Sequence, residues 1–121
     1  LMVAVLEGQV ETTRLLLEAG ANPNRPDRYG ATPLMYCAQG QAGPELARTL
    51  IGHGAQVNAR DMEGDTVLMY AVTHGQPALV ALLLAEGADP EAKNFDAQTP
   101  RDKCRDEAIA SLLSSASRTG G

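Results

Sequence analysis

The chain has 121 residues, enough for one domain with a single core, and 44% of them are hydrophobic, a share typical of folded proteins. Its formal net charge of -5 argues against a nucleic-acid partner, because affinity for phosphate backbones comes largely from Lys and Arg. The longest apolar run, residues 1–6, is far shorter than the roughly 20 residues of a bilayer-spanning helix, so we expect no direct membrane insertion.

The predicted elements are short helices in pairs, separated by long loops. A first helix contains Leu1 and is followed by a Leu-rich second helix. Each later pair starts at a repeated threonine, which is a good N-cap and is twice followed by proline, the residue favoured at the first helical position. Each second helix ends at a glycine, which accepts a left-handed backbone without steric cost. The starts lie at Thr32, Thr66 and Thr99, Pro44 and Pro77 lie near the first turns of second helices, and the stops lie at Gly20, Gly54 and Gly87.

Two of these signals recur along the sequence with the same period. The Gly-Ala pairs and the threonines both recur at intervals of 34 and then 33 residues. A one-residue insertion falls between Gln39 and Pro44, where we expect a turn between helices. Helices of two to three turns are marginal alone because nucleation is costly, so each pair must pack on its neighbours, as in a solenoid.

The repeated unit, Thr-Pro-Leu followed by a Leu-rich helix and Gly-Ala, resembles the ankyrin repeat from residue 1 to about residue 113. The resemblance implies an all-α solenoid of stacked helix-turn-helix units with long, hairpin-like loops. We expect a partial repeat at 1–26, repeats at 27–60 and 61–93, a C-terminal capping repeat at 94–113, and a flexible tail at 114–121.

The sequence departs from the family pattern at a position where the family has histidine. Met35 and Met69 stand there, and because a thioether is a weak acceptor we expect them only to fill space. In the last copy Thr99 and Asp102 have the spacing of a capping box. That copy therefore has its own helix start.

The first helix lacks a preceding loop and partner repeat, so we expect the sequence to be part of a longer polypeptide. In that case Leu1, Val3 and Leu16 lie on or near a face that upstream repeats cover. Cys37 and Cys104 match Ala4 and Ala71 of other copies, which predicts a small buried site for each thiol. Without metal-ligand spacing they favour a reducing cytoplasmic or nuclear location.

Catalytic chemistry has no support in the sequence. His53 and His74 lie 21 positions apart without an acidic or Cys cluster in register, and no phosphate loop or nucleophile motif is present. We expect no enzymatic activity, no cofactor and no metal.

The resemblance places partner binding on a concave face made of loop tips and inner helices. The tips follow Asp27, Asp61 and Asn94, and each carries a large apolar or aromatic residue, a type favoured at interface centres. Packing of adjacent tips on each other is the alternative explanation. The predicted partner-binding residues are Arg28, Tyr29, Met62, Glu63, Asp65, His74, Phe95 and Asp96.

Acidic residues around these tips predict a protein or peptide partner with a hydrophobic anchor and a basic residue, bound by a monomeric module. The leading functional hypothesis is a protein-protein interaction scaffold. The alternatives are a stoichiometric inhibitor of an enzyme such as a kinase, and a passive spacer or oligomerisation unit. Asn24 and Asn58 resemble asparagines that are hydroxylated in other ankyrin repeats, but turn formation within their own loops explains them more simply.

Overall fold

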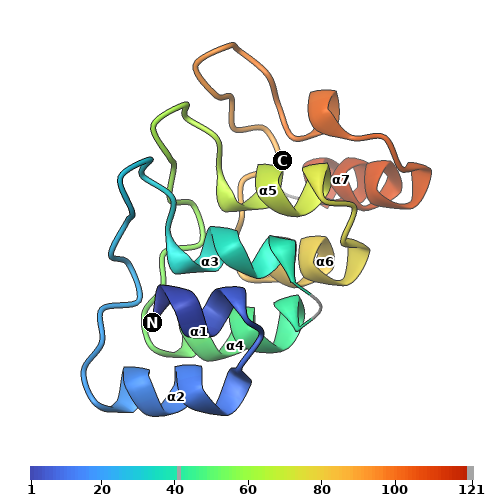
Figure 1. Ribbon diagram of the computed structural model, residues 1–121. Coiled ribbons are helices and arrows are strands. Elements are labelled where there is room, and N and C mark those ends of the chain that lie inside the picture. The colour runs from blue at the N-terminus through green and yellow to red at the C-terminus, as the bar shows by residue number, and fades with distance from the viewer. Residues whose placement is uncertain (41, 120–121) are drawn as a thin grey trace.

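Figure 1 shows the computed structural model, which describes residues 1–40 and 42–119, as a stack of short helices with long loops projecting to one side. The inner helices α1 (Met2–Leu6), α3 (Pro33–Tyr36) and α5 (Val67–Thr73) form one layer. The outer helices α2 (Val10–Glu18), α4 (Gly43–Gly52), α6 (Pro77–Ala85) and α7 (Glu107–Thr119) form the second. Two 3₁₀ turns, η1 (Cys37–Gln39) and η2 (Arg101–Lys103), complete the elements.

This arrangement confirms the all-α stack of helix pairs predicted from the period. Each inner helix packs on the next inner helix and on the outer helix of its own pair, and the outer helices pack in the same order. Among the described residues there is no named strand, only one isolated β-bridge between Arg60 and Thr66. The three glycines that follow outer helices have φ values of 100°, 97° and 99°, as predicted for helix stops.

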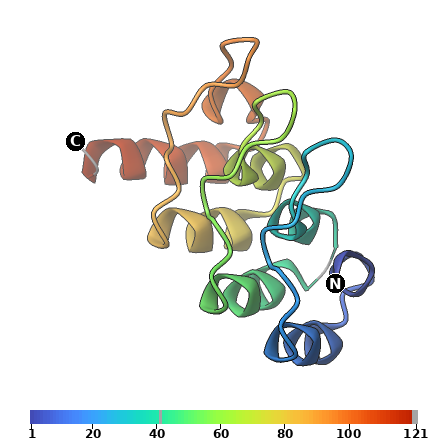
Figure 2. The ribbon, with the colours of Figure 1, turned by 90° about the vertical axis from the view of Figure 1, so that its left-hand side faces the viewer.

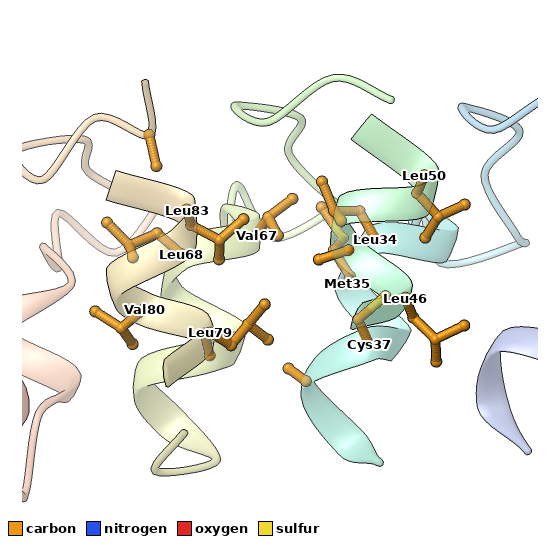
Figure 3. Packing of buried hydrophobic residues seen from close by; sticks show 14 of the residues in the cluster. Leu34, Met35, Cys37, Leu46, Leu50, Val67, Leu68, Leu79, Val80 and Leu83 are labelled. Atoms are coloured by element: carbon orange, nitrogen blue, oxygen red, sulfur yellow. The ribbon is translucent and has the colours of Figure 1, made fainter. Parts of the chain in front are cut away.

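The core consists of leucines at equivalent positions of successive repeats. Leu34 and Leu68 are both fully buried on the inner helices, and Leu50 and Leu83 are buried on the outer ones. Figure 3 shows these side chains on two neighbouring helix pairs, Leu34 with Leu50 on one and Leu68 with Leu83 on the other. Burying one such side chain contributes about 1.5–3 kcal/mol, so stacking supplies the stability that the short helices lack alone.

The one-residue insertion alters the second repeat locally. Helix α3 ends after four residues and continues as η1, whereas the equivalent α5 is a seven-residue α-helix. Gln41, within the predicted insertion, lies outside the described residues.

The last repeat differs from the prediction in two ways. Its first helix is only the turn η2, although the predicted capping box is confirmed: Thr99 N–H donates to Asp102 Oδ2 at 2.9 Å, and Asp102 N–H donates to Thr99 Oγ1 at 3.3 Å. The prediction of a flexible tail from residue 114 is wrong for 114–119, because α7 continues to Thr119. Its apolar side, with Ile109 and Leu113 buried, holds the helix against α6. Residues 120–121 lie outside the described part of the chain.

One of the two methionines at the histidine position, Met35, does more than fill space. Both are buried, but Met35 Sδ also accepts a hydrogen bond from Thr32 N–H at 3.4 Å. In the next repeat Thr66 Oγ1 accepts from Met69 N–H at 3.3 Å, which caps α5. The prediction that Met35 only fills space is therefore wrong, since its thioether accepts a weak bond at the helix start.

Candidate functional site

A groove of about 650 Å³ lies between the long loops and the inner helices of the second and third repeats. In Figure 2 the loop tips project beyond the inner helices in a row, and they form one wall of this groove. Aromatic, methionine and acidic side chains dominate its lining. The lining residues are Tyr29, Ala31, Met35, Tyr36, Gln39, Asp61, Met62, Glu63, Asp65, Tyr70, Thr73, His74 and Lys103.

An aspartate at the base of each tip sets the shape of the loop. Asp27 Oδ1 accepts hydrogen bonds from Tyr29 N–H at 2.9 Å and Ala31 N–H at 3.0 Å. The other carboxylate oxygen of Asp27 accepts a hydrogen bond from the hydroxyl group of Tyr36, which lies on α3. One carboxylate thus folds the tip and ties it to the inner helix.

The third repeat repeats this arrangement. Asp61 Oδ1 accepts from Glu63 N–H at 2.9 Å and Asp65 N–H at 3.0 Å, and Asp61 Oδ2 accepts from the Tyr70 hydroxyl. Two Asp–Tyr pairs in repeat register therefore hold the wall of the groove to its floor.

The hydrogen bonds of the two Asp–Tyr pairs also determine the protonation state of the tyrosines. The hydrogen bond from Tyr36 lowers the pKa of Asp27, and the same bond raises the pKa of Tyr36. Burial, followed by the hydrogen bond to Asp61, raises the pKa of Tyr70. At neutral pH both phenols are therefore uncharged donors.

Adjacent tips are joined through their backbones while their large side chains stay exposed. Met62 N–H donates to Tyr29 O at 3.0 Å, and Phe95 N–H donates to Glu63 O at 3.0 Å. Tyr29, Met62 and Phe95 nevertheless remain 64%, 66% and 74% exposed. Tip-to-tip packing and an exposed apolar row are thus both present in this molecule.

The acidic character of the groove is concentrated at Asp61 and Glu63. Asp65, by contrast, accepts a hydrogen bond from Asn94 Nδ2 at 2.8 Å and lies 3.6 Å from Lys103 Nζ. Lys103 therefore offsets the Asp65 charge at the C-terminal side of the groove.

The groove brings together five of the eight predicted partner-binding residues. Tyr29, Met62, Glu63, Asp65 and His74 line it. The other three do not line it: Arg28 lies with its guanidinium carbon 5.5 Å from the centre of the Tyr29 ring, and Phe95 and Asp96 belong to the next loop.

Sequence reasoning missed most of the inner-helix floor. Tyr36 and Tyr70 carry the clearest missed signal, because they recur at the repeat interval of 34 residues. Gln39 and Thr73, one helical turn after these tyrosines, also recur at this interval and also line the groove.

The asparagines of the long loops join successive repeats. Asn24 Nδ2 donates to Gly54 O at 2.9 Å, and Asn24 Oδ1 accepts from Gln56 N–H at 2.8 Å. Asn58 makes the same pair of bonds one repeat later, to Gly87 O at 3.0 Å and from Asp89 N–H at 2.9 Å. The expectation that each asparagine satisfies its own loop is wrong, because its side-chain bonds go to the next loop.

The two cysteines are free thiols in different surroundings. Cys37 is buried, its S–H donates to Pro33 O at 3.7 Å, and burial raises its pKa to about 12. Cys104 is partly exposed and its S–H donates to Asp106 O at 3.1 Å. The prediction of a buried site is wrong for Cys104, because the last repeat has a 3₁₀ turn in place of an inner α-helix.

In the described part of the chain, no cluster of three or more His, Cys, Asp or Glu could hold a metal ion. Within the same residues, no helix has the length and apolarity needed to cross a bilayer.

A family model for ankyrin repeats, in three copies, matches residues 1–94. Among curated proteins, cyclin-dependent kinase 4 inhibitor B of Rattus norvegicus is 50% identical over 42 residues, which cover 35% of this chain and 32% of that protein. The Mus musculus protein of the same name matches equally well over the same lengths. Cyclin-dependent kinase inhibitor 2A of Homo sapiens is 48% identical over 42 residues, 35% of this chain and 27% of that protein. The matched segments span about a third of these relatives or less.

Proposed function

Because this chain belongs to the ankyrin-repeat family, whose members mediate protein interactions, we propose that it binds a protein or peptide partner in the groove between its loop tips and inner helices. The observation that carries the proposal is the groove itself, which gathers exposed Tyr29 and Met62 with Asp61 and Glu63 around one concavity. Aromatic and methionine side chains are favoured at the centres of protein interfaces.

The chemistry of the groove favours a partner with a hydrophobic anchor beside a basic residue. The anchor packs against Tyr29 and Met62, and a Lys or Arg head pairs with Glu63 and Asp61. Asp65 contributes less to this pairing because Lys103 already lies beside it. Complementary charge sets the orientation and association rate of such a partner more than its affinity.

The test is a selection from a random 12-residue peptide library displayed on phage, followed by affinity measurements with a synthetic peptide of the most enriched sequence. Joint replacement Tyr29→Ala and Met62→Ala is expected to weaken binding by about 2 kcal/mol, the size of an interface hot spot. Phe95→Ala is the matched control, because Phe95 is equally exposed on a neighbouring tip but does not line the groove. If the double variant binds as tightly as the unaltered chain, the groove is not the binding site.

A second candidate function is stoichiometric inhibition of a cyclin-dependent kinase. The similarity to three curated inhibitors of such kinases supports it, although each match covers only about a third of either chain. Titration of cyclin-dependent kinase 4 with this chain tests the idea directly. Inhibition requires activity to fall in proportion to added chain up to one equivalent, and activity that stays constant excludes this role for that kinase.

A further inference from the structure

The inner helix of the second repeat ends differently from those of the first and third repeats. In the first repeat Gly8, with φ of 72°, donates its N–H to Val5 O at 3.0 Å. In the third repeat Gly75, with φ of 65°, donates its N–H to Val72 O at 3.1 Å. These are helix stops closed by a left-handed glycine. Gly40, which follows η1, is instead extended, with φ of -112° and ψ of -179°.

A side chain of the third repeat donates hydrogen bonds at the end of η1. Gln76 lies in the turn between α5 and α6. Its Nε2 donates to Ala38 O and, at 3.0 Å, to Gly40 O. Ala38 is the equivalent of Val72, whose carbonyl accepts a glycine N–H of its own repeat. Because a primary amide has two N–H groups, one side chain holds both carbonyls of the second repeat.

The Gln76 amide fits closely between the end of η1 and the start of α4. Gly43 is the first residue of α4 and is buried. A Cβ at Gly43 would lie 2.8 Å from Gln76 Oε1 and 2.7 Å from Cys37 O, so the amide or the backbone would have to move. The lack of a side chain at Gly43 therefore leaves room for the amide.

The two carbonyls that Gln76 holds belong to the residues on either side of Gln39. Gln39 is the last residue of η1, is exposed and lines the groove. Its equivalent Thr73 is the last residue of α5, a continuous α-helix. Gln76 is not one of the groove-lining residues, so its influence on the groove passes through η1.

We propose that Gln76 is a positioning residue of the groove, which holds η1 so that the side-chain amide of Gln39 is presented to the bound partner. The inference rests on the proposed function and deepens it, because it assigns a polar contact to the bound segment. A primary amide both donates and accepts hydrogen bonds, so Gln39 pairs with a peptide group of the partner's backbone. With η1 held in place, this pairing costs less conformational freedom.

The test is a double-mutant cycle on Gln39 and Gln76, measured with the synthetic peptide of the most enriched sequence. Gln39→Ala is expected to weaken the peptide about threefold to tenfold, as for the loss of one or two neutral hydrogen bonds. Gln76→Ala should weaken it similarly, but by less than about twofold in a chain that already carries Gln39→Ala, because the two residues act as a unit. A merely structural role of Gln76 would weaken binding by the same factor in both chains.

Two further variants make the cycle specific. Gln9 occupies the same turn position in the first repeat, but its Nε2 donates to Glu7 Oε2 at the surface, at 3.1 Å. Gln9→Ala is therefore the matched control and should change affinity less than about twofold. Gln76→Met has a similar volume but no donor, so it guards against loss of packing and should bind as weakly as Gln76→Ala. If Gln76→Met binds like the unaltered chain, the amide hydrogen bonds are not needed and the positioning role is overturned.

The outcomes separate the two proposals. If Tyr29→Ala with Met62→Ala weakens the peptide, but Gln76→Ala has no effect or acts independently of Gln39, the positioning role is overturned and the groove stands. If the cycle shows coupling while the change at Tyr29 and Met62 has no effect, the positioning role stands and the contact with the loop tips fails. If no peptide is enriched, or if none of these changes alters binding, both proposals are overturned.

Discussion

Gly64 and Ala97 occupy the same turn position in successive loops, and both adopt a left-handed backbone, with φ of 79° and 60°. For Ala this conformation costs about 1–2 kcal/mol. Replacing Ala97 with Gly removes that cost. The same change also makes the unfolded chain more flexible, which lowers the free energy of unfolding by about 0.4–1 kcal/mol. We therefore expect Ala97→Gly to raise the free energy of unfolding by about 0.5–1 kcal/mol.

The reverse change at Gly64 should do more harm than the backbone conformation alone explains. A Cβ at Gly64 falls 2.8 Å from Phe95 Cδ1 and 2.9 Å from the Phe95 backbone nitrogen. The ring can turn away, but that nitrogen is held by its hydrogen bond to Glu63 O. Gly64→Ala must therefore shift the neighbouring tip, and we expect a loss of about 2 kcal/mol or more.

Gly75→Ala separates the two effects. Gly75 has a similar φ of 65°, but a Cβ there meets nothing within 4 Å. Its expected loss is the conformational part alone, about 0.5–1 kcal/mol. Urea unfolding followed by far-UV circular dichroism measures all three variants. A stability loss for Ala97→Gly, or equal losses for Gly64→Ala and Gly75→Ala, would refute this account of the tips.

Three further predictions concern the contacts between and within repeats. Asn58→Ala should lower the free energy of unfolding by about 1–2 kcal/mol in the same assay, because it removes two hydrogen bonds to the next loop; no change would show that water replaces them fully. Because Tyr36 lowers the pKa of Asp27 in the folded chain, the associated stabilisation is complete above about pH 4 and is lost as pH falls through the folded-state pKa. Between pH 5 and 3, Asp27→Asn should therefore lose less stability than the unaltered chain, and parallel pH profiles would contradict this. With a thiol reagent at pH 7.5, Cys104 should react readily and Cys37 only after unfolding, as peptide mapping of the labelled protein can show; rapid labelling of Cys37 would place it at the surface.

The sequence was sufficient for the fold because the repeat period and the helix-end residues point to the same layers. Gly20, Gly54 and Gly87 end the outer helices as expected, and Leu34 and Leu68 occupy matching buried positions. Each of these features depends on local backbone preference or on hydrophobic spacing, both of which a single sequence displays. The structure of the last repeat was harder to predict from the sequence, since α7 extends beyond the predicted end of that repeat and η2 replaces a full helix.

The candidate site was only partly predictable, because a period shows which residues are equivalent but not which side of an inner helix faces the loops. The tips Tyr29 and Met62 were found from their place after a turn-forming aspartate. Tyr36 and Tyr70 were not found, although they recur, because on sequence alone a recurring tyrosine suits a packed core as well as a groove. Their role depends on hydroxyl contacts with the loop aspartates, which only the folded arrangement brings within reach.

The distribution of these Asp–Tyr pairs explains why the groove lies at the second and third repeats. The first repeat has Val3 at the tyrosine position, which offers no hydroxyl, and the last has Lys103 there with Asn94 at the aspartate position. Lys103 reaches back to Asp65 instead, so it joins two repeats and does not brace its own loop. Among the residues that the structure describes, the second and third repeats have wall and floor joined by a carboxylate and a phenol. A partner that binds between them meets side chains already held in place, and less conformational freedom is lost on binding than at positions without such a pair.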